Sequence, residues 1–260
     1  LATVGGNGIL NGEVINNNTG GSILIDRTVG SGLHVSFATF NNSASLKIGS
    51  TASIGSAGIS CQSGRFNNFP GGEITIDRAT SDGITNYYGS PYREFGNSGK
   101  IFIGKAAAIG GYGILNEAAF NNNPDGEITI DRTANSGIYV RDDNDSNTRP
   151  AVFSNSGKLT IGSTATLGDN GIQNRVTFHN NASGQIWIDR TESDGLFNAA
   201  GNFNNAGQVT IGATIAPTGD GLENAATFHN QACGEIALHD NLINDGAFTN
   251  AGLLRIHTTL

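Results

Sequence analysis

The sequence predicts an all-β protein that folds as a right-handed parallel β-helix, a β-solenoid of about ten coils with three short strands in each coil. Three observations predict this fold. Glycine is abundant, at 38 of 260 residues, and charged residues make up only 14% of the chain, a composition that favours turns over helix interiors. A Phe-x-Asn triplet recurs at intervals of roughly 25 residues. Each repeat also holds two further β-type motifs, separated by Gly, Asn and Ser.

The Phe-x-Asn triplet marks one strand of each coil. Nine of the 13 phenylalanines stand at its first position, namely Phe40, Phe66, Phe95, Phe120, Phe153, Phe178, Phe203, Phe228 and Phe248. Residues two apart lie on the same face of a strand. Coils stacked about 4.8 Å apart then place Phe on Phe and Asn on Asn. We therefore expect a continuous apolar core and an inward-facing asparagine ladder, in which each buried amide finds a partner.

The other two motifs supply the remaining strands. A β-rich pair follows each phenylalanine, as in Ile74-Thr75-Ile76, and Gly-Ile-x-Asn comes next, as in Gly83 to Asn86. The coils also alternate between two types. Eight positions separate the phenylalanine from the first isoleucine in one type (Phe66 to Ile74) and six in the other (Phe95 to Ile101). A longer corner in one coil is thus offset by a shorter corner in the next.

The chain resembles a family once these repeats are recognised. The stretches Phe153–Asn174 and Gly184–Thr191 are similar to Asn-rich repeats of giant secreted or cell-surface parallel β-helix proteins of gliding marine Bacteroidota, of the adhesin or appendage type. The resemblance covers nearly the whole chain. It implies a structural or adhesive segment of a large exported surface protein or extracellular appendage, which mediates attachment or assembly. The alternative is a carbohydrate-binding or polysaccharide-degrading β-helix protein.

The domain organisation follows from the repeats. Residues 1–260 are expected to form a single β-helix domain, an excerpt of a longer chain, with loop insertions at 87–94 and 139–152. Function on β-solenoids usually lies in such loops. The candidate ligand- or partner-binding residues are Tyr87, Tyr88, Tyr92, Arg93, Tyr139, Arg141 and Asp142. A sugar-stacking or protein-contact patch and a plain surface loop both remain open.

A weak calcium candidate lies in the second insertion. Asp143, Asp145 and Asn147 have the spacing that begins a calcium loop. The glycine expected at the sixth position and the acidic residue expected at the twelfth are missing, because Thr148 and Ser154 stand there. We therefore expect no metal site.

Asp-Arg pairs recur on alternate coils, at Asp26-Arg27, Asp77-Arg78, Asp131-Arg132 and Asp189-Arg190. They could form a charged strip that binds an anionic glycan or a neighbouring protomer. Their repetition favours a corner ladder instead, in which each Asp accepts hydrogen bonds from turn amides and each Arg pairs with a carboxylate.

Composition and motifs exclude several function classes. A net charge of −8 disfavours nucleic acid as a partner, and no apolar run is long enough for a membrane span. Neither a nucleophile elbow nor a phosphate-binding loop is present, so we expect no enzyme activity and no cofactor. Cys61, which replaces a ladder asparagine, and Cys233 are expected to lie too far apart for a disulfide. The expected partners are other copies of the chain or flanking domains, with surface glycans as a further option, and the expected location is secreted or cell-surface.

Overall fold

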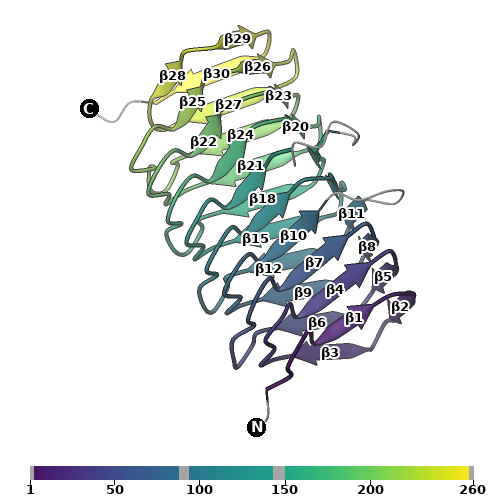
Figure 1. Ribbon diagram of the computed structural model, residues 1–260. Coiled ribbons are helices and arrows are strands. Elements are labelled where there is room, and N and C mark those ends of the chain that lie inside the picture. Colours follow the sequence, from purple (N-terminus) through teal and green to yellow (C-terminus); the bar gives the residue numbers. More distant parts are fainter. Residues whose placement is uncertain (1–2, 88–93, 143–149, 258–260) are drawn as a thin grey trace.

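The computed structural model describes residues 3–87, 94–142 and 150–257. These residues form a parallel β-solenoid whose strands stack along one axis, from the N-terminal end to the C-terminal end (Figure 1). Every coil contributes one strand to each of three ten-stranded parallel sheets, as the three motifs predict. Within the described ranges, no helix is long and apolar enough to cross a membrane.

The first sheet consists of the Gly-Ile-x-Asn strands. They are β1 (Ile9–Asn11), β4 (Leu33–Ser36), β7 (Ile59–Gln62), β10 (Ile84–Tyr87), β13 (Ile114–Asn116), β16 (Ile138–Val140), β19 (Ile172–Asn174), β22 (Leu196–Asn198), β25 (Leu222–Asn224) and β28 (Leu242–Asn244).

The second sheet consists of the Phe-x-Asn strands. They are β2 (Val14–Asn17), β5 (Thr39–Asn42), β8 (Arg65–Asn68), β11 (Glu94–Asn97), β14 (Ala119–Asn122), β17 (Val152–Asn155), β20 (Thr177–Asn180), β23 (Asn202–Asn205), β26 (Thr227–Asn230) and β29 (Ala247–Asn250).

The third sheet consists of the β-rich pairs. They are β3 (Ser22–Ile25), β6 (Ser45–Ile48), β9 (Glu73–Ile76), β12 (Lys100–Ile103), β15 (Glu127–Ile130), β18 (Lys158–Ile161), β21 (Gln185–Ile188), β24 (Gln208–Ile211), β27 (Glu235–Leu238) and β30 (Leu253–Ile256).

The core is the continuous apolar column that the repeats predict. Phenylalanines of neighbouring coils are in register, and their ring centroids lie 4.5 to 5.2 Å apart from Phe40 to Phe248. The rings from Phe40 to Phe228 are fully buried. Stacking identical rings at the strand spacing satisfies both the sheet geometry and close packing.

Two asparagine ladders lie inside the solenoid. The long ladder runs through the second sheet from Asn17 to Asn250, and each Nδ2 donates to the Oδ1 of the next coil at 2.7 to 2.9 Å. The ladder in the first sheet is interrupted. Cys61 stands beside Asn86, as predicted, and Asn86 Oδ1 is buried without a partner among the described residues.

Candidate functional site

The Asp-Arg pairs are corner clamps of the scaffold. Asp131 is buried and accepts hydrogen bonds from the backbone N–H groups of Thr164 and Ala165 in the next coil, at 3.0 and 3.3 Å. The predicted ladder of aspartates on turn amides is thus confirmed here. Equivalent bonds reach Asp26, Asp77 and Asp189.

The arginines of these pairs differ from the prediction, because none of them forms an ion pair with a carboxylate of the described residues. Arg132 Nη1 donates to the carbonyl oxygens of Gly104 and Lys105 in the preceding coil, at 2.9 and 2.6 Å. Arg78 and Arg190 make the same type of contact with the coil before them. The pair therefore ties its coil to both neighbours.

The predicted tyrosine and arginine site centres on Tyr139. This residue lies in β16 rather than in the loop that was predicted to contain it, and it is only 7% exposed. Its ring centroid lies 5.0 Å from that of Tyr112, and the Arg141 guanidinium carbon lies 5.6 Å from its ring centroid. Arg175 Nη1 donates to the Tyr139 hydroxyl oxygen at 3.3 Å. Tyr139 is thus a packed residue of the outer face of the first sheet.

Arg141 is held by a carboxylate beneath it. Its Nε and Nη2 atoms lie 2.8 and 2.7 Å from Oε1 of Glu117, whose side chain is 6% exposed. A guanidinium engaged in this way positions the start of the second insertion, and a charge-assisted pair of this geometry is strong. Asp142 accepts a hydrogen bond from the Ala151 N–H at 2.8 Å and closes the base of the same insertion.

Tyr87 ends β10 at the first insertion and is partly exposed. Burial raises the pKa of its hydroxyl, and the nearby carboxylates of Asp82 and Glu117 add to the increase. The other predicted site residues lie outside the described residues: Tyr88, Tyr92, Arg93, Asp143, Asp145 and Asn147. Among the predicted site residues that the structure describes, Tyr139 and Arg141 are in contact.

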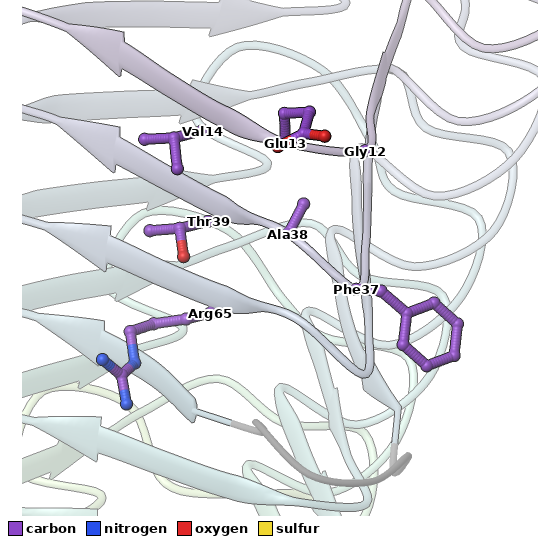
Figure 2. Close-up of a pocket in the computed structure, with 7 residues that line it drawn as sticks. All are labelled: Gly12, Glu13, Val14, Phe37, Ala38, Thr39 and Arg65. Carbon is purple, nitrogen blue, oxygen red and sulfur yellow. The ribbon is translucent and has the colours of Figure 1, made fainter.

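A hollow of about 390 Å³ lies at the corner between the first and second sheets near the N-terminal end. Val14, Thr39 and Arg65 form a row along it, while the Phe37 ring is directed away from that row (Figure 2). Phe37 is 71% exposed and has a φ of 53°. Ser63 also has positive φ at the matching two-residue corner between β7 and β8, so the left-handed conformation belongs to the corner and not to the aromatic residue.

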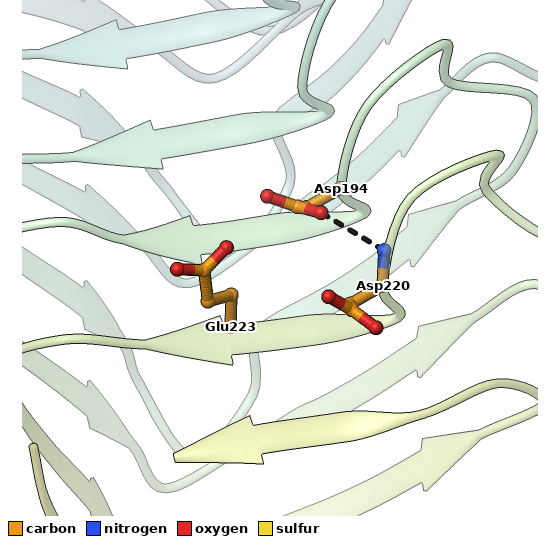
Figure 3. A group of neighbouring side chains, drawn as sticks. All are labelled: Asp194, Asp220 and Glu223. Atoms are coloured by element: carbon orange, nitrogen blue, oxygen red, sulfur yellow. Dashed lines mark hydrogen bonds between the residues drawn. The ribbon is translucent and has the colours of Figure 1, made fainter. Parts of the chain in front are cut away.

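Three carboxylates that the sequence analysis missed gather on the outside of the solenoid. Oxygens of Asp194, Asp220 and Glu223 lie within 4.8 Å of one another, and Asp194 Oδ1 accepts the Asp220 N–H at 2.9 Å (Figure 3). A signal existed in the sequence, since Asp-Gly-Leu occurs at the same place in two consecutive coils. Clustered carboxylate oxygens are ligands of the kind that Ca²⁺ takes.

The electrostatics of this group oppose full ionisation. Burial raises the pKa of Asp194, and the neighbouring carboxylates of Asp220 and Asp169 contribute to the increase. Burial likewise raises the pKa of Glu223, with Asp194, Asp220 and Asp245 contributing. A carboxyl whose pKa is raised by folding stabilises the protein below its unfolded pKa of about 4, and this stabilisation is lost as the pH rises through the folded pKa.

We expect Asp194→Asn to raise the melting temperature at pH 7 by about 1–3 °C. The amide keeps an oxygen for the Asp220 N–H and removes one negative charge from the group. The gain should shrink as the pH falls through the raised pKa of Asp194, because the carboxyl of the unmodified chain then takes up a proton and loses its charge. Melting followed by circular dichroism from pH 4 to 8 measures this, with the exposed Asp125→Asn as control. An equal gain for both variants, or a gain independent of pH, would contradict the assignment.

Comparisons with known proteins assign no family to the chain. No protein family model and no curated protein matches it. One solved structure that is similar is a TibC-catalysed, hyperglycosylated fragment of TibA. It is 15% identical, the match covers 99% of this chain and 96% of that one, and the TM-score is 0.20. A score this low establishes no common arrangement, so the fold rests on this chain's own strand pairing.

Proposed function

We propose that this chain is a structural and adhesive segment of a large exported surface protein or extracellular appendage, where it mediates attachment or assembly. The observation that carries the proposal is the way consecutive coils are bonded to each other. They share three β-ladders, a phenylalanine stack, a long asparagine ladder and corner clamps. Separating two neighbouring coils must break all of these contacts together, which suits a rod that bears force.

The resemblance of the repeats to those of giant surface β-helix proteins supports the same role. The two insertions begin at strands two apart in the first sheet, after Tyr87 at the end of β10 and near Arg141 beyond β16. A rigid stack presents such loops to partners at fixed intervals. The proposed partners are further copies of the chain, flanking domains and surface glycans.

Immunogold electron microscopy of intact cells tests the proposed location. An antibody raised against residues 94–142 should label the cell surface or extended fibres without permeabilisation. A cytoplasmic marker, visible only after permeabilisation, provides the control for cell integrity. Labelling that appears only in permeabilised cells would overturn the proposal.

A further inference from the structure

The outer face of the third sheet carries two aromatic residues that the fold does not require. Phe102 and Trp187 occupy the outward position at the centre of their strands. The same position holds Thr75, Thr129, Thr160 and Thr210 on the neighbouring strands. The neighbouring coils show that threonine is sufficient at this position, and an aromatic ring that points outward adds nothing to the core.

Each of the two aromatic side chains is positioned by one polar neighbour. The indole Nε1 of Trp187 donates to Oδ2 of the buried Asp189 at 2.7 Å, while 40% of the residue stays exposed. The ammonium of Lys105 lies 4.3 Å from the centroid of the half-buried Phe102 ring. Rings fixed before a ligand arrives lose little conformational entropy on binding.

The two rings form the ends of a strip that runs across consecutive strands of the third sheet. Strands β12, β15, β18 and β21 are consecutive in the third sheet, so three strand steps, about 14 Å, separate Phe102 from Trp187. The hydroxyl-bearing Thr129 and Thr160 lie between them in register. A parallel row of exposed polar side chains borders the strip, at Lys100, Glu127, Lys158, Gln185 and Gln208.

This combination fits an extended chain of sugars. The C–H face of a pyranose ring packs on an aromatic ring with burial of apolar area on both sides. Threonine hydroxyls and glutamine amides offer donors and acceptors to sugar hydroxyls. A strip that extends over four consecutive strands also matches a linear polymer better than a compact ligand.

The charges favour a neutral polymer over a polyanion. Lys100 pairs with Glu127 at 3.3 Å, and Lys105 is engaged with Phe102. The chain as a whole carries a net charge of −8, which repels polyanions. We infer that the outer face of the third sheet, from Phe102 to Trp187, binds a neutral polysaccharide aligned with the long axis of the solenoid. This inference rests on the proposed adhesive function and specifies its ligand class.

Affinity electrophoresis in native gels containing neutral polysaccharides tests the site. The probes are soluble β-glucan, glucomannan, xylan and dextran, with alginate as the anionic comparison. At least one neutral polymer should retard the chain, and added salt should leave the retardation unchanged. Trp187→Thr should weaken binding about tenfold, and Phe102→Thr should act in the same direction. Threonine is the residue that the neighbouring coils use, so the solenoid is preserved.

The matched control is Phe37→Ser, which removes an exposed aromatic residue elsewhere and installs the residue of the matching corner in the next coil. It should bind as the unmodified chain does. Trp187 is the only tryptophan, so a shift of its emission to shorter wavelength on titration reports the same contact without any variant.

Three results would overturn the inference: no retardation by any neutral polymer, binding that Trp187→Thr and Phe102→Thr leave intact, or retention by alginate alone that salt abolishes. These outcomes are independent of the immunogold labelling. Surface labelling together with absent polysaccharide binding refutes the ligand and leaves the proposed location standing.

Discussion

Replacing Phe120 with alanine should lower the free energy of unfolding by about 3–5 kcal/mol. Its ring is fully buried and lies between Phe95 and Phe153, at centroid distances of 4.6 and 4.8 Å. Removing it empties one position of a column in which the backbone spacing is fixed by three sheets. The neighbouring rings cannot close the gap without breaking the strand register, so the cavity term adds to the lost burial.

Urea denaturation followed by circular dichroism measures this loss. Phe37→Ala is the matched control, because it deletes the same atoms from a ring that is 71% exposed, and its effect should stay within about 0.5 kcal/mol. Equal losses for the two variants would show that the phenylalanine column does not hold the coils together.

The repeating part of this fold could be predicted from the sequence because identical side chains stack on themselves. The phenylalanine column, the inward asparagines and the alternating coil types all follow from spacing alone, since a period of two within strands fixes the inward face. The place of Cys61 in a ladder follows in the same way.

Contacts between different residue types were harder to predict. Arg132 donates to backbone carbonyls of the preceding coil. Every residue has a backbone carbonyl, so the pattern of side chains does not reveal which one accepts the bond. Tyr139 occupies an outward position, yet Tyr112 and Arg141 pack on it from neighbouring segments. Both contacts depend on how corners of unequal length bring side chains together. The spacing of the strands in the sequence does not predict these contacts.

The second large effect is expected from Asn122→Leu, which should lower the free energy of unfolding by about 2–6 kcal/mol. Asn122 Nδ2 donates to Asn155 Oδ1, and its Oδ1 accepts from Asn97 Nδ2, both at 2.8 Å. Leucine has a similar size but offers neither group. One buried amide donor and one buried amide oxygen then lose their ladder partners, and each costs about 1–3 kcal/mol.

Asn121→Leu is a stringent control for this variant. Asn121 is the neighbouring residue of the same strand, but it faces outward and donates to Glu94 Oε1 at 2.9 Å. The two variants share the change in composition and in strand propensity, and they differ in the buried ladder. Denaturation should therefore separate them by about 2 kcal/mol or more. If both lose the same stability, the asparagines matter only for turn geometry, and cohesion between coils comes from the sheets and the phenylalanine stack. A large difference would instead make the long ladder a principal axial bond of the rod.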